Sequence, residues 1–250
     1  MKAHVVNAGR SWQWIVDGFA LFRKYPLMWI ALTILLVVVW MASFAIPILG
    51  PLLFNLLSPV LFAGLMIGCK AVDNGEVLEF SHLFAGFQKN ATALVTIGGV
   101  YLVGTIVIVG IIFIMAGGSM LATVMSKSPS DLQMLGAALR SMALAIMIGL
   151  ALYVPLMMLI WFAPLLVVFH NLNPVEAMKL SLSACLMNWL SFLVYGAVVL
   201  VLWFIASIPL FLGLVVLLPV LICSVYTSYK DIFNAGGAAP AGGRNPFLSN

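Results

Sequence analysis

Long apolar stretches separated by short polar segments make up most of the chain. A helix needs about 20 mostly apolar residues to cross the hydrocarbon core of a bilayer. Stretches of about this length lie at residues 27–46, 52–69, 91–116, 142–169 and 189–208, and a sixth follows the turn at 209–213 and runs to about residue 229. The pattern predicts an all-α fold, a polytopic transmembrane helical bundle with about six spans.

Charged residues are too scarce for a water-soluble protein, and they are unevenly distributed. They make up 7% of the chain, against 64% hydrophobic residues, whereas soluble proteins carry about 25% charged residues. Nine lysines and arginines lie on one side of the predicted spans, and two, Lys127 and Arg140, lie on the other. Because positive residues favour the cytoplasmic side, we expect both termini in the cytoplasm.

Three segments carry apolar residues at helical spacing, and each precedes a span that leaves the cytoplasm: residues 11–24, 78–89 and 174–182. We predict that they form cytoplasmic interfacial helices. The spans that return to the cytoplasm each contain a proline one to two turns before their end, namely Pro59, Pro164 and Pro219. The recurring order predicts a threefold internal repeat; the alternative is a chance likeness between apolar segments.

This organisation divides the chain into three parts. Residues 1–26 contain the first interfacial helix, and residues 27–230 form the six-span domain. Residues 231–250 are rich in glycine and alanine and predict a flexible cytoplasmic tail. The stretch at 126–131 is the only polar loop on the side away from the termini.

Candidate binding residues fall into three groups. The first group would either contact lipid headgroups or a partner, or form an ordinary aromatic belt. It contains Trp12, Trp14, Arg23, Lys24 and Trp29. The second group lies inside spans and would either line a cavity or pack between helices, and it contains Asn55, Ser58, Pro59, Pro164 and Pro219. The third group is a G-x-x-x-G face that favours close helix packing, formed by Gly64 and Gly68.

No motif in the sequence indicates recognisable chemistry. The patterns G-x-S-x-G, H-E-x-x-H and G-x-x-x-x-G-K-[ST] are absent. Cys69, Cys185 and Cys223 are odd in number and lack C-x-x-C spacing. We therefore expect no catalytic residue, no metal and no cofactor, and the lack of a dense Lys/Arg run argues against nucleic-acid binding.

Several runs of residues resemble a family of uncharacterised small inner-membrane proteins, mainly from proteobacteria. The runs are residues 12–19, 21–29, 56–65 and 82–87, and the likeness covers most of the chain. The resemblance implies a bacterial inner (cytoplasmic) membrane protein, and it supplies no functional residue. More loosely, the organisation is similar to the membrane domain of some glycerophosphodiester phosphodiesterases, whose catalytic part is missing here.

These features together favour an integral inner-membrane protein that is not an enzyme and acts by binding. It would serve as a scaffold, an accessory subunit or a lipid-contacting protein. The alternative is a transporter or channel for a neutral or lipid-like solute. The expected partners are membrane lipids and either a larger membrane complex or further copies of the same chain.

Overall fold

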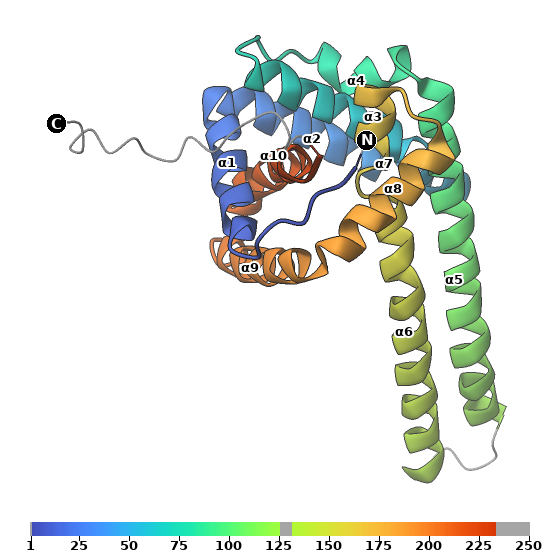
Figure 1. The fold of residues 1–250 in the computed structure, drawn as a ribbon. Helices are drawn as coiled ribbons and strands as arrows, with labels where there is room; N and C mark the ends of the chain where they lie inside the picture. The colour runs from blue at the N-terminus through green and yellow to red at the C-terminus, as the bar shows by residue number, and fades with distance from the viewer. Residues whose placement is uncertain (1, 126–131, 234–250) are drawn as a thin grey trace. The chain divides into compact units, whose positions relative to one another are not determined.

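Helices form almost all of the part of the chain that the structure describes. The computed structural model describes residues 2–125 and 132–233, and this part contains ten helices and no β-strand (Figure 1). They are α1 (Arg10–Lys24), α2 (Pro26–Ser43), α3 (Leu49–Asp73), α4 (Ser81–Gln88), α5 (Ala91–Met125), α6 (Leu132–Ile160), α7 (Ala163–His170), α8 (Pro174–Met187), α9 (Trp189–Ser207) and α10 (Leu214–Phe233).

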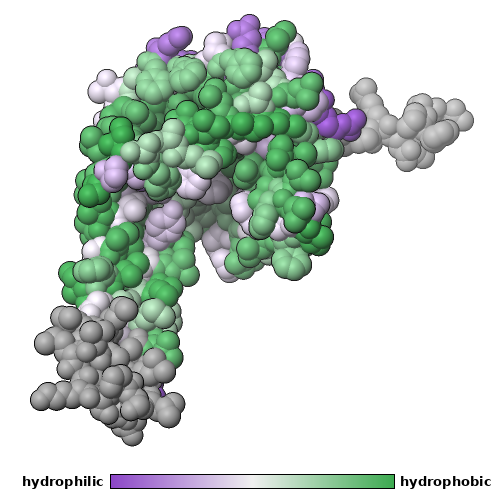
Figure 2. Space-filling model, turned by 180° about the vertical axis from the view of Figure 1, so that it is seen from behind, coloured by the Kyte–Doolittle hydropathy of each residue, from purple (hydrophilic) through white to green (hydrophobic). Residues whose placement is uncertain are grey.

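Among the described residues, six helical segments are long and apolar enough to cross a membrane, which confirms the predicted all-α bundle with six spans. They are Pro26–Ser43, Leu49–Asp73, Ala91–Gly118, Leu139–His170, Trp189–Ser207 and Leu214–Phe233. Figure 2 shows hydrophobic side chains over most of the face that it presents, as expected for a surface in contact with lipid. The polar loop at 126–131 and the tail from residue 234 lie outside the described residues, whereas α10 continues three residues beyond position 230.

The segments predicted to be interfacial are helical as well. They form α1, α4 and α8, the three helices that precede α2, α5 and α9. Each interfacial helix is therefore followed by two spans, and the second span of each pair contains one of the three prolines. The element order agrees with the predicted threefold repeat.

Contacts divide the chain into two compact units, each assembled from segments that are distant in sequence. The first unit contains Met1–Thr33, Cys69–Leu78 and Ser183–Asn250. In it, α1 packs on α9 and α10. The second unit contains Ile34–Gly68 and Glu79–Leu182. In it, α5 and α6 lie side by side as a long hairpin (Figure 1).

The fourth span is interrupted rather than bent at its second proline. Helix α6 ends at Ile160, and α7 begins with Pro164 in its first turn, where the missing N–H of proline breaks no helical hydrogen bond. The hydroxyl of Ser181 in α8 accepts a hydrogen bond from the Phe162 N–H at 3.0 Å and donates one to the Met158 carbonyl at 2.7 Å. Ser181 thus satisfies backbone groups that the interruption exposes, as the apolar interior of a membrane requires.

Small residues let the interfacial helices approach the backbone of a span. A Cβ atom on Gly18 of α1 would lie 2.7 Å from the Ser224 nitrogen and 2.9 Å from the Val220 carbonyl oxygen, both in α10. A Cβ atom on Gly86 of α4 would overlap the carbonyl oxygen of Val60 in α3. Gly64 of α3 lies against backbone carbonyls of α4, and a Cβ atom on Gly64 would overlap these carbonyls.

These contacts occupy equivalent places in the repeat. Val60 and Val220 each follow the proline of their helix by one residue, so α4 packs beside Pro59 of α3, and α1 packs beside Pro219 of α10. Ser181 likewise joins α8 to the end of α6, next to the α7 proline. Each interfacial helix therefore packs on the second span of the preceding copy, and the first packs on the last.

We predict that the substitution Gly18→Ala destabilises the protein by about 1–3 kcal/mol, because the added methyl group meets backbone atoms that cannot rotate away. Gly196→Ala in α9 is the matched control, since a Cβ there meets nothing within 4 Å and alanine is the better helix former. Thermal unfolding of both variants in detergent measures the difference. Equal midpoints for Gly18→Ala and the unchanged protein would contradict the close packing.

Candidate functional site

The apolar surface of helix α1 is wider than the face that it buries. The buried face contains Ser11, Trp14, Ile15, Gly18, Leu21 and Phe22. The exposed part of the apolar surface contains Trp12, Val16 and Phe19. A helix at the surface of a water-soluble protein normally has a polar outer face, so these exposed apolar residues require another explanation.

Trp14 is held inside the first unit. Its side chain is 0% exposed, and its ring centroid lies 5.5 Å from that of Phe192 and 5.9 Å from that of Tyr195, both in α9. The indole N–H donates a hydrogen bond of 2.8 Å to the Asp231 carboxylate in α10. Trp29 is also fully buried, and its indole nitrogen has no hydrogen-bond partner among the described residues.

Asp231 receives three hydrogen bonds and fastens α1 to the end of α10. The Arg10 guanidinium donates the other two hydrogen bonds to Asp231, through Nε at 3.0 Å and through Nη2 at 2.9 Å. Bidentate arginine–carboxylate pairs are among the stronger polar contacts in proteins. The hydrogen bond to Asp231 raises the pKa of Arg10 above its usual value.

A second carboxylate fastens α10 to the end of α3. Asp73 accepts a hydrogen bond of 2.6 Å from the Lys230 ammonium group and one of 3.1 Å from the Tyr226 hydroxyl. The Lys24 ammonium group donates to the Val72 carbonyl oxygen at 3.0 Å, beside the same helix end. Both carboxylates therefore take part in structural contacts.

The N-terminal segment before α1 is also bound to the first unit. Asn188 accepts a hydrogen bond from the Val6 N–H at 2.7 Å and donates one to the His4 carbonyl at 2.9 Å. The Ser191 hydroxyl donates to the Val6 carbonyl at 3.0 Å, and the His4 N–H donates to the Ile232 carbonyl at 2.9 Å. The segment is thus fixed to the α8–α9 junction and to the end of α10.

The exposed face of α1 ends in a basic residue. Trp12 is 54% and Phe19 44% exposed, and Arg23 lies one turn beyond Phe19 with its guanidinium carbon 5.9 Å from the Phe19 ring centroid. This distance is within the range of a cation–π contact. We call Trp12, Val16, Phe19 and Arg23 the α1 stripe.

Helix α4 presents a similar surface in the second unit. Phe80, Phe84 and Phe87 are exposed at the same spacing of four and three residues, and the exposed Lys89 follows them. Leu83 and Gly86 form the buried side of the helix. We call these three phenylalanines and Lys89 the α4 stripe.

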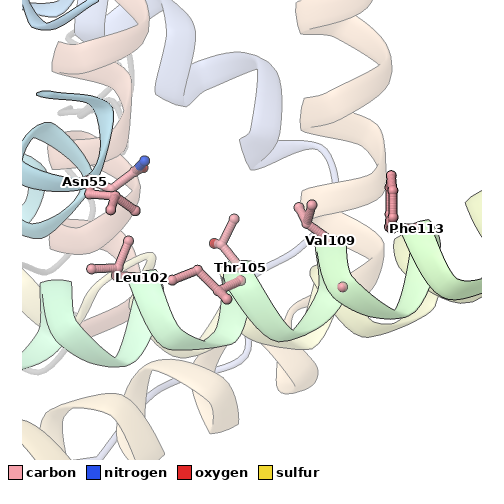
Figure 3. A pocket seen from close by; sticks show the side chains of 8 residues that line it. Asn55, Leu102, Thr105, Val109 and Phe113 are labelled. Carbon is pink, nitrogen blue, oxygen red and sulfur yellow. The ribbon is translucent and has the colours of Figure 1, made fainter. Parts of the chain in front are cut away.

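An apolar groove lies between α3 and α5 in the second unit. It has a volume of about 390 Å³, within the range of roughly 300–1,000 Å³ that is usual for ligand sites. Figure 3 shows Asn55 of α3 opposite a row of α5 side chains. The groove is lined by Leu52, Asn55, Leu102, Thr105, Ile106, Val109, Gly110 and Phe113.

The residues that the sequence suggested for a cavity lie in three helices, α3, α7 and α10. Asn55 lines the groove, and Ser58 donates a hydrogen bond to the Asn55 carbonyl at 2.9 Å. Pro59 lies inside α3, and Pro164 and Pro219 are buried in α7 and α10. Gly68 is buried in α3. Of this group only Asn55 lines the groove, which is otherwise formed mainly by residues of α5.

Two residues important to these sites were not identified from the sequence. Asp231 was assigned to the flexible tail, and Thr105 was treated as part of an apolar span. The available signal for Asp231 was a lone carboxylate directly after Lys230 at the end of an apolar stretch. Thr105 gave no distinct signal, because single threonines are ordinary in such helices.

One curated protein offers a comparison over most of the chain. This sequence is 29% identical over 230 residues to a protein of Burkholderia thailandensis named "Probable inner membrane protein", and the match covers 90% of this chain and 84% of that protein. Neither a family model nor a solved structure matches the chain. Together with the six apolar helices, the likeness supports a multi-pass protein of the inner membrane. The suggested likeness to the glycerophosphodiester phosphodiesterase membrane domain finds no support in the comparisons.

We predict that Trp14→Phe destabilises the protein by about 1.5–3 kcal/mol, because it removes a hydrogen bond to a charged group while keeping an aromatic ring. Trp12→Phe is the control, since Trp12 is exposed on the same helix. Chemical unfolding in detergent, followed by circular dichroism, compares the two variants. If both variants unfolded at the same denaturant concentration as the original protein, the role of Asp231 as an anchor would be wrong.

Proposed function

We propose that this protein is not an enzyme and acts by binding anionic lipid at the membrane surface through the α1 and α4 stripes. One observation carries the proposal: the outer face of α1 is a row of exposed apolar side chains that ends at Arg23. Helices that lie in the headgroup region carry Trp, Phe and Leu on their apolar face and Lys and Arg on their polar face, and in α1 Arg23 lies at the end of the apolar row. There the aromatic rings enter the lipid boundary and the guanidinium group reaches the phosphates.

The placement of the basic residues supports an anionic partner. Arg23 and Lys89 each lie at the end of an aromatic row, in segments that belong to the positive side of the charge distribution. A lysine or arginine near an anionic membrane surface contributes about 1 kcal/mol to binding. Lys24 differs from both, because its ammonium group is bonded to the Val72 carbonyl and contributes to the structure of the first unit.

A role without catalysis is supported by the use of the carboxylates. Asp73 and Asp231 would be natural candidates for acid–base chemistry, yet both bind cationic side chains that hold helix ends together. Trp14, first considered for lipid contact, serves the same structural purpose. The proposed lipid surface therefore consists of the two stripes and excludes Trp14 and Trp29.

Transport of a lipid-like solute is the second candidate function, and the groove between α3 and α5 favours it. The groove is apolar over most of its lining and belongs to two spans. Surface binding remains our first choice, because the stripes recur on two interfacial helices.

We predict that Arg23→Glu lowers the binding of phosphatidylglycerol by roughly five- to thirtyfold, because it removes one attraction of about 1 kcal/mol and adds a repulsion of similar size. Native mass spectrometry of the protein in mixed phosphatidylglycerol and phosphatidylethanolamine measures the bound lipids. Lys179→Glu in α8 makes the same charge change at an exposed site beside no aromatic row. If both variants lost the same amount of bound phosphatidylglycerol, the loss would reflect net charge alone, and the α1 stripe would be rejected as the binding surface.

We also expect both termini to lie in the cytoplasm, since the positive residues are concentrated on their side. In a variant without native cysteines, a cysteine added after Asn250 should resist a membrane-impermeant maleimide in spheroplasts, and Ser128→Cys should react. Permeabilised spheroplasts, in which both sites react, provide the control. The opposite labelling pattern would place the two stripes on the periplasmic surface.

A further inference from the structure

We infer that the groove between α3 and α5 is a binding site for one hydrocarbon chain of a membrane amphiphile and for the oxygen-bearing head at the end of that chain. The chain would occupy the apolar part of the groove, and a carbonyl or carboxylate oxygen of the head would accept hydrogen bonds from Asn55 and Thr105. This site is separate from the α1 and α4 stripes, and the inference does not depend on the proposed surface binding.

The lining and the location of the groove define the hydrocarbon part of the ligand. The α5 wall extends from Leu102 to Phe113, a length of about 16 Å at the usual helical rise. Ile106, Val109 and Phe113 are more than half exposed along this wall. Because both walls are membrane spans, the groove opens where hydrocarbon chains, rather than water, are available to fill it.

Two polar side chains lie among these apolar residues. The Asn55 amide nitrogen carries two hydrogens, and its bond of 3.0 Å to the Pro51 carbonyl uses one of them. The Thr105 hydroxyl oxygen is buried and has no hydrogen-bond partner within the described part of the chain. A threonine in a helix is divided between two χ1 rotamers, and Thr105 lines the groove.

These polar groups favour a head that accepts hydrogen bonds. Figure 3 shows Asn55 on the α3 wall near Leu102, and Thr105 about one turn further along the α5 wall. In an apolar medium an unsatisfied donor is costly, so the oxygen atoms of a bound head would accept hydrogen bonds that water does not compete for. A plain hydrocarbon would leave both donors unsatisfied. A fatty acid and a phospholipid acyl chain with its ester carbonyl share the required chemistry.

The groove can be filled without disturbing the fold. Gly110 lines it, and a Cβ atom at this position meets nothing within 4 Å. Gly110→Leu therefore places a side chain where the ligand chain would lie. Gly118→Leu is the matched control, because it makes the same change on the same helix outside the groove, also with nothing within 4 Å.

The test uses the intact protein in vesicles with a diazirine-bearing fatty acid, and mass spectrometry locates the labelled peptides. We expect labelling of α3 and α5 that falls at least about tenfold in Gly110→Leu and stays unchanged in Gly118→Leu. Asn55→Leu and Thr105→Val should each reduce it about three- to tenfold, the usual effect of one lost hydrogen bond. Labelling by a diazirine-bearing alkane without oxygen should be unchanged in Asn55→Leu and Thr105→Val.

The outcomes separate the ligand classes. Competition by unlabelled phospholipid but not by unlabelled fatty acid would assign the site to an esterified lipid, and the reverse to a free acid. Labelling that is equal in Gly110→Leu and Gly118→Leu would show only bulk lipid around the protein and overturn the site. Labelling that depends on Gly110 but not on Asn55 or Thr105 would overturn the oxygen-bearing head.

Discussion

Both units depend on the close approach of an interfacial helix to the backbone of a membrane span. In lipid, apolar side chains gain little by leaving their surroundings, so helices associate through tight packing and hydrogen bonds. Gly18 and Gly86 supply the tight packing in α1 and α4, and Ser181 supplies hydrogen bonds in α8. The contacts of Gly18 and Gly86 position the two helices that carry the exposed aromatic rows.

The sequence was most informative where the bilayer imposes a length or a period. Six spans follow from the thickness of the hydrocarbon core, and three amphipathic helices follow from their apolar spacing. The faces of α1 could not be assigned in this way. Trp12 and Trp14 are two residues apart and point to opposite sides of the helix, and because both sides are apolar, only the packing partner α10 decides which is buried. Likewise, Arg10 and Asp231 meet although 221 residues separate them.

The proposed binding features lie in different parts of the molecule and use different chemistry. The α1 and α4 stripes combine aromatic rings with cations at the ends of surface helices, which suits phosphate groups and the lipid boundary. The groove combines an apolar wall with hydrogen-bond donors inside the spans. The sequence left open whether Asn55 lines a cavity or packs between helices, whereas Thr105 gains significance only from the proximity of α5 to α3.

The pairing of α1 with α10 has a consequence for the order of biosynthesis. At roughly 5–20 residues per second, the ribosome completes Asp231 about 10–45 s after Arg10. Until then the Trp14 face of α1 has neither its carboxylate nor its helical partner, so α1 must wait at the membrane surface. Closure of this contact requires α10, and a product truncated before α10 would keep that apolar face open to membrane proteases and chaperones.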